Sequence, residues 1–257
     1  MLDLTPAEWT AILLSLRVAA VATVVATPFG IALAWLLARR DFWGKSLIDA
    51  MVHLPLVLPP VVTGYLLLLT FGRRGLVGAW LADTLGIVFA FRWTGAALAC
   101  GVMSFPLLVR PMRLSIEAVD QRLEQAAETL GAAPWRIFLT VTLPLALPGV
   151  LAGMVLGFAK AIGEFGATIT FVSNIPGETQ TISSAIYSLI QTPDGDVAAL
   201  RLVIISVAIA VAALIGAEWF ARRAKNSDAI SAPIAITMET TTSRIAAVSP
   251  SGVWISE

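Results

Sequence analysis

Five long apolar stretches constrain this chain more than any other feature of its sequence. They run over residues 12–37, 51–71, 93–109, 145–172 and 200–220. A helix needs about 20 apolar residues to cross the hydrocarbon core of a bilayer. Charged residues make up 13% of the chain, about half their usual share in a soluble domain. The sequence therefore predicts an all-α integral membrane protein, and its zero formal net charge gives no sign of nucleic-acid binding.

The second apolar stretch contains helix-breaking prolines, at Pro55 and at Pro59–Pro60. Proline removes a backbone hydrogen bond and kinks a helix. In lipid such breaks persist where protein or a cavity covers the freed carbonyls, so this stretch is expected to face protein or a pathway. A further segment, 182–190, is too short and too polar to span alone and is predicted to be a partial or re-entrant helix. The prediction is five to six transmembrane helices.

Lysine and arginine in the short connections predict the orientation, because they favour cytoplasmic loops. The connections after the first and third stretches and the segment after the fifth are basic, whereas the amino end and the fourth connection are acidic. The amino end is therefore expected outside and the carboxyl end inside, although the basic second connection departs from this pattern. Residues 1–225 are predicted to form the transmembrane domain. Residues 226–257, rich in Ser, Thr and Ala, are predicted to form a disordered cytoplasmic tail.

A polar segment between the third and fourth stretches, residues 116–144, is predicted to form two short helices. Its apolar residues recur at steps of three and four, which is one face of a helix. They are Ile116, Val119, Leu123, Ala127 and Leu130. Gly131 can end this helix in a left-handed conformation, and Pro134 suits the first turn of a second helix. Periodicity alone leaves open a plain amphipathic connector.

The same segment resembles the coupling loop of ABC importer permeases. That loop reads Glu-Ala-Ala, three residues, Gly, nine residues, and Ile-x-Leu-Pro. The chain has Gln125-Ala126-Ala127, then Gly131, then Val141-Thr142-Leu143-Pro144, with Gln for Glu and Val for Ile as the departures. In that family the loop docks into a cleft of the ATPase subunit, a helix-in-groove contact. The residues implied in coupling are Glu124, Gln125, Ala126, Ala127, Gly131, Leu143 and Pro144.

The resemblance implies the type I ABC importer permease fold, with a cytoplasmic coupling helix and no ATPase site of its own. The sequence lacks the phosphate-binding pattern G-x-x-x-x-G-K-[ST], so ATP and Mg²⁺ are expected on a separate ATPase chain. No catalytic residue, bound cofactor or metal is expected in this chain. Its one histidine, His53, gives the serines no plausible base, and its one cysteine, Cys100, lies in an apolar run.

Two charged residues, Lys160 and Glu164, lie four residues apart within the fourth stretch, which places them on one helix face. Ionisable groups at membrane depth are costly and normally face the bundle interior or water. Two interpretations stay open: an internal ion pair that fixes helix packing, or a lysine that lines the route and attracts an anion. Gly157, Gly163 and Gly166 are expected to let helices approach closely. The translocation-path candidates are Lys160, Gly163, Glu164, Gly166, Pro59 and Pro60.

Longer stretches are most similar to the permeases of molybdate ABC transporters. The resemblance covers about residues 8–223, and its clearest parts are 53–68, 102–120, 163–182 and 185–196. Sulfate permeases are similar around residues 163–166, whereas residues 174–181 are closer to the molybdate branch. Tungstate stays an alternative because the two oxyanions have nearly the same size and charge.

The resemblance also implies partners and location. It implies a permease homodimer in the lipid of the bacterial inner membrane, two copies of an ATPase subunit and a periplasmic oxyanion-binding protein. The path is then expected at the homodimer interface, lined mainly by the second to fourth spans. A rival from another class is an ion-coupled secondary transporter that uses Lys160 and Glu164 as a charge relay and needs no ATPase.

Overall fold

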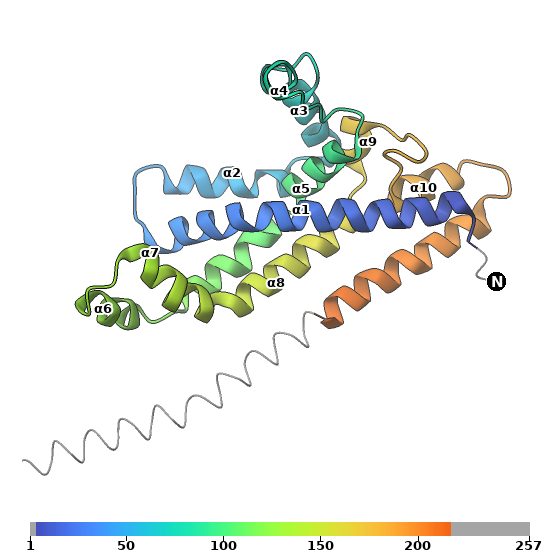
Figure 1. Ribbon diagram of the computed structural model, residues 1–257. Helices are drawn as coiled ribbons and strands as arrows, with labels where there is room; N and C mark the ends of the chain where they lie inside the picture. Colours follow the sequence, from blue (N-terminus) through green and yellow to red (C-terminus); the bar gives the residue numbers. More distant parts are fainter. Residues whose placement is uncertain (1–3, 217–257) are drawn as a thin grey trace, which may run out of the picture.

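The chain folds into helices that run back and forth along one bundle (Figure 1). The computed structural model describes residues 4–216, and every regular element within that range is helical. The elements are α1 (Pro6–Arg39), α2 (Lys45–Val57), α3 (Pro60–Phe71), α4 (Leu76–Leu85), α5 (Trp93–Glu117), α6 (Gln121–Thr129), α7 (Pro134–Ile137), the π-helical stretch Phe138–Thr142, α8 (Leu143–Ile162), α9 (Gly166–Val172), α10 (Ile182–Leu189) and a last helix over Asp196–Gly216. The predicted tail, 226–257, lies outside the described residues.

The longest helix, α1, runs along the whole bundle (Figure 1). A capping box fixes its start, because the Thr5 hydroxyl accepts from the Glu8 backbone N–H and the Glu8 carboxylate accepts from the Thr5 N–H. Glu8 also accepts from Arg201 at 2.9 Å, which ties the start of α1 to the last helix. With 34 residues α1 is about 50 Å long, more than the roughly 30 Å core of a bilayer.

The central helix is α5, which packs against α1 on one side and α8 on another. Its buried contacts are made largely by small residues, among them Ala96, Ala99 and Cys100. Gly153 of α8 lies so close to α5 that an added Cβ atom would collide with the backbone oxygen of Leu108. Lipid supplies no hydrophobic drive for helix association, so close packing of small residues holds such a bundle together.

The number of spanning helices agrees with the five predicted stretches. Within residues 4–216, four helices can cross a membrane by length and composition: α1, α5, Pro134–Ile162 and Asp196–Gly216. The pair of α2 and α3 forms a fifth candidate. The segment predicted over 182–190 is the short helix α10. Residues 217–220 of the fifth predicted stretch lie outside the described part of the chain.

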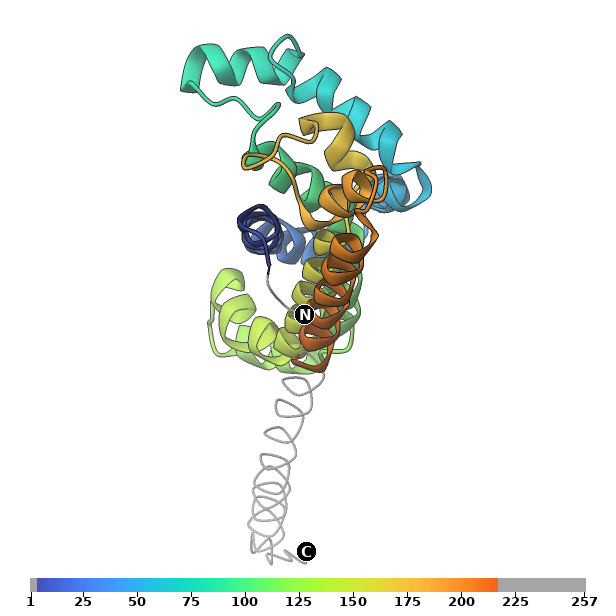
Figure 2. The same cartoon turned by 90° about the vertical axis from the view of Figure 1, so that its right-hand side faces the viewer.

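Two of the predicted spans are interrupted. The second stretch is bent by 115° between α2 and α3, which turns α3 and α4 away from the bundle (Figure 2). A kink was predicted there, but the bend is far sharper than one proline produces inside a helix. The prediction of one span over 145–172 is wrong, because α8 ends at Ile162 and α9 begins at Gly166. The side chain of Glu164, which precedes the N-cap Phe165, accepts the Ala167 N–H at 3.1 Å and so satisfies a free donor in the first turn of α9.

The predicted single helix over residues 116–130 is also wrong. Ile116 is buried in the last turn of α5, and Val119 is buried in the connection that follows. Asp120 then caps α6 by accepting from the backbone N–H of Arg122 at 2.9 Å. The apolar spacing continues across this turn, so periodicity gave no sign that the helix stops.

Candidate coupling and translocation site

The coupling segment, residues 116–144, closes one end of the bundle (Figure 1). Between α6 and α7 the chain turns at Gly131, whose φ of +82° is a left-handed conformation that favours glycine. Pro134 occupies the first turn of α7. The predicted glycine corner is therefore confirmed, and a second helix begins at Pro134 as predicted, but it is not a separate short helix. The π-helical stretch Phe138–Thr142 then leads directly into α8, so the coupling segment continues into a spanning helix.

The helix α6 presents its surface outward, since none of its residues is buried. Gln125 and Ala126 are exposed and Ala127 is half-buried. The small alanine side chains leave a flat surface over which a groove of another protein can close. Leu143 and Pro144 lie at the start of α8, where Leu143 is half-buried and Pro144 exposed.

Glu124 differs from the other predicted coupling residues because its side chain is engaged within the chain. Its carboxylate accepts from the guanidinium of Arg39 at 2.9 Å and from the hydroxyl of Thr142 at 2.6 Å. The same nitrogen of Arg39 donates to the backbone oxygen of Val119 at 3.0 Å. Sequence reasoning missed Arg39 and Thr142 as partners, and no local pattern links residues so far apart in the chain.

The two helix breaks lie against each other, because α3 packs along α9. A Cβ atom added to Gly166 would lie 2.7 Å from Cβ of Pro60, and one added to Gly64 would lie 2.5 Å from the backbone oxygen of Ala167. Pro59 precedes α3 as its N-cap. Helix breaks that meet inside a bundle are typical of transport sites in membrane proteins. The structure thus brings the predicted path candidates Pro59, Pro60 and Gly166 together.

Lys160 and Glu164 form an ion pair of 2.7 Å across the second break. Glu164 is 2% exposed, whereas 31% of the Lys160 side chain is exposed. Glu164 follows the end of α8, so the pair joins α8 to the turn before α9 and does not lie on one helix face. Gly163, in the same turn, has no neighbour closer than 3.9 Å to an added Cβ atom and mediates no helix contact.

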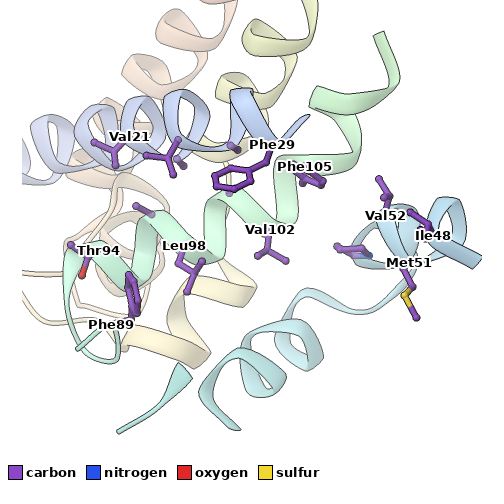
Figure 3. A pocket seen from close by; sticks show the side chains of 16 residues that line it. Val21, Phe29, Ile48, Met51, Val52, Phe89, Thr94, Leu98, Val102 and Phe105 are labelled. Carbon is purple, nitrogen blue, oxygen red and sulfur yellow. The ribbon is translucent and has the colours of Figure 1, made fainter. Parts of the chain in front are cut away.

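An apolar cavity of about 630 Å³ lies between α1, α2 and α5 (Figure 3). Phe29, Met51 and Phe105 lie in its wall, and Thr94 is the one polar lining residue. None of the predicted path candidates lines it. Such a wall gives a charged oxyanion almost no hydrogen-bond donor to replace water, so the chemistry of this cavity does not suit an anion.

The features that the described residues offer are an ion pair at a helix break and an exposed helical corner. Among these residues, no group of three or more His, Cys, Asp or Glu side chains could hold a metal ion. Spanning helices with two adjacent breaks and an exposed helical corner at one end define a membrane transport subunit that engages another protein.

Comparisons with known proteins give the family. The sequence matches the family described as "Binding-protein-dependent transport system inner membrane component" over residues 26–226. The chain belongs to this family. It is 62% identical over 219 residues to the "Molybdenum transport system permease protein ModB" of Escherichia coli strain K12, covering 85% of this chain and 96% of that protein. The protein of the same name from Haemophilus influenzae is 56% identical over 216 residues, covering 84% of this chain and 94% of that protein.

Solved structures show the same fold. The crystal structure of a bacterial ABC transporter involved in the import of the acidic polysaccharide alginate matches with a TM-score of 0.67 at 19% identity. The match covers 86% of this chain and 81% of that one. The predicted all-α fold of ABC importer permeases is therefore confirmed.

Proposed function

We propose that this chain is the membrane-spanning permease subunit of a molybdate importer, driven by ATP hydrolysis on a separate subunit. The observation that carries the proposal is the 62% identity to the molybdenum permease of Escherichia coli over 96% of that protein's length. The coupling segment supports the separate ATPase, because α6 is an exposed helix at the end of the bundle. The sequence contains no phosphate-binding pattern of its own.

The end of the bundle that carries α6 is assigned to the cytoplasm. Basic residues gather in the elements at that end, and such residues favour the cytoplasmic side. They are Arg39, Arg40, Arg113, Arg122 and Arg136. The opposite end carries Glu8 at the start of α1 and the acidic residues Asp194 and Asp196. The amino end is accordingly periplasmic and the carboxyl end cytoplasmic.

The working assembly contains two copies of this chain, two ATPase subunits and one periplasmic binding protein. The family description itself names dependence on a binding protein. Each α6 docks into a groove of one ATPase through Gln125, Ala126 and Ala127. The loaded binding protein docks on the end that carries α10. ATP closes the two ATPase subunits, which displace the coupling segments and rock the spanning helices between outward-open and inward-open states.

An ion-coupled transporter is the weaker alternative because of how Glu164 is held. One carboxylate oxygen accepts from Lys160 and the other accepts from the Ala167 backbone N–H. Both oxygens are engaged and the side chain is buried, so Glu164 is held as a structural partner of Lys160 and of the first turn of α9. Lys160, which is partly exposed, keeps two further N–H donors for an anion.

Uptake of radiolabelled molybdate tests the proposal. Cells without their own high-affinity system would express this permease with its neighbouring ATPase and binding protein, and excess sulfate or tungstate would compete. Uptake that resists sulfate and yields to tungstate is expected. Uptake suppressed by sulfate would replace molybdate with sulfate as the substrate. Uptake that persists without the ATPase would favour the ion-coupled alternative.

A further inference from the structure

Few contacts hold α6 to the membrane helices. It contributes no buried residue to the core, so hydrophobic packing does not fix its position. Among the described contacts, Glu124 makes the only side-chain hydrogen bonds from α6 to residues outside the helix. It also packs against α7 and the π-helical stretch Phe138–Thr142, and the connections at 118–120 and 130–133 join it to α5 and α7.

The contacts of Glu124 are strong ones. Its carboxylate accepts from Arg39 at 2.9 Å and from Thr142 at 2.6 Å, and hydrogen bonds to a charged group are stronger than neutral ones. The Arg39 side chain is 8% exposed and that of Glu124 is 21% exposed, while Thr142 is 1% exposed. Water therefore does not compete freely for this cluster, and removing one charge leaves the other poorly solvated.

The cluster joins α6 to helices that already pack against one another at this end of the bundle. Arg39 is the last residue of α1, and Thr142 is the last residue before α8. Arg39 also donates to the Val119 backbone oxygen at 3.0 Å, which fixes the turn between α5 and α6. One carboxylate on α6 thus connects that helix to α1, to the start of α8 and, through Arg39, to the end of α5.

We propose that Glu124, Arg39 and Thr142 form a tie that carries the displacement of α6 to α1 and α8 during transport. Glu124 is then a positioning residue inside the permease and not a contact for the ATPase, whereas its exposed neighbour Gln125 faces the partner. Without the tie, α6 would be linked to α8 only through α7 and the π-helical stretch and would have no polar contact with α1, so less of a push on α6 would reach the membrane helices. This inference rests on the proposed function and adds the route by which the coupling segment acts.

The test is the amount of anion transported per ATP hydrolysed. The complex of this permease, its ATPase and its binding protein would be reconstituted in liposomes with the variants Glu124→Gln, Arg39→Met and Thr142→Val. Each is expected to keep the ATPase bound and hydrolysing ATP. The transport ratio should fall by about tenfold, within the usual range for coupling between distant sites.

A double variant separates the tie from a docking role. If Glu124 acts through Arg39, the combination of Glu124→Gln with Arg39→Met should lower the ratio no further than either single change, because the two residues act as one unit. A multiplied loss in the double variant would overturn the proposal. So would a Glu124→Gln variant that fails to retain the ATPase on purification.

Asp41→Asn is the matched control. It removes another ion pair at the same end of the bundle, which joins Asp41 to Lys45 at 2.8 Å. The Asp41 carboxylate is fully exposed. The hydrogen bond from Lys45 holds the pKa of Asp41 below its usual value, so this carboxylate is charged at neutral pH. The transport ratio should not change. If Arg39→Met fails to insert, Glu124→Gln and Thr142→Val carry the test alone.

The failure of the two proposals would look different. An error in the proposed substrate would appear as no molybdate uptake by the unsubstituted complex. In that case the variants would be compared by how strongly the loaded binding protein stimulates their ATP hydrolysis. An error in the tie would appear as unchanged coupling in Glu124→Gln while the unsubstituted complex works normally.

Discussion

Replacing Lys160 should destabilise the protein more than replacing its partner Glu164. The two residues form one ion pair, but their surroundings differ. Glu164 is 2% exposed, whereas 31% of the Lys160 side chain is exposed. Lys160→Met leaves a buried carboxylate whose remaining donor is the Ala167 backbone N–H. Glu164→Gln leaves an ammonium that still reaches solvent, and the new amide oxygen can keep the bond to Ala167.

The magnitudes follow from these environments. Removing one partner of a buried pair typically costs about 3–5 kcal/mol, which applies to Lys160→Met. Glu164→Gln loses one charge-assisted hydrogen bond, which is worth about 1.5–3 kcal/mol. A difference of about 2 kcal/mol corresponds to roughly 4–8 °C in melting temperature for a chain of this size. The double variant Lys160→Met with Glu164→Gln should melt above Lys160→Met, because it removes the buried charge.

Thermal unfolding of the purified variants in one detergent checks this order. Lys160→Arg is the control, since it keeps the positive charge and should lose less stability than Lys160→Met. The reasoning is refuted if Lys160→Met melts at or above Glu164→Gln. A double variant that melts below Lys160→Met would likewise show that a buried unpaired carboxylate is not the cause.

Three further predictions concern single positions. Gly131→Pro or Ala127→Trp should abolish uptake while the protein still inserts in the membrane, as judged by fractionation and transport assays; normal transport would contradict the coupling role. Gly64→Val should lower the melting temperature by several degrees, because even its Cβ atom would lie 2.5 Å from a backbone oxygen of α9. Gly101→Ala is the control and should leave the melting temperature unchanged, because an added Cβ atom there has no neighbour closer than 3.8 Å. Cys100, 1% exposed, should resist maleimide until the protein is denatured; rapid labelling of the folded protein would contradict its packing.

The membrane spans could be predicted because their signal is local. Within the described residues each of the five apolar stretches is largely helical, although the second and the fourth are each divided into two helices. The corner at Gly131 could be predicted from a glycine at one position. The breaks in the helices were harder to predict. Prolines in the sequence indicate the break before α3. At the break after Ile162, the Glu164 side chain accepts a hydrogen bond from the first turn of α9. A glutamate inside an apolar run gives no sign from sequence alone that it caps a helix.

The partners of the site residues could not be predicted, because they come from distant parts of the chain. The resemblance implies Glu124, Gln125 and Ala126 alike as coupling residues. The structure separates them, since Glu124 is held by Arg39, 85 residues away, while Gln125 and Ala126 are exposed. The spacing of Lys160 and Glu164 predicted that they share one helix face, with an ion pair as one of two interpretations. The ion pair forms, but the helix has ended before Glu164.

The two sites are connected by one continuous helical run. The helical run Pro134–Ile162 has 29 residues and is therefore about 43 Å long. It begins in the coupling segment and ends at the break that Lys160 and Glu164 bridge. A helix is stiff along its axis, so we expect a displacement at Pro134 to be passed along this run toward Ile162, where the hydrogen-bonded ladder stops. The next element is α9, packed on α3 through glycine contacts. The ion pair of Lys160 and Glu164 lies at that break and holds the end of α8 close to the start of α9. Without it, the two segments would be free to separate where α8 ends.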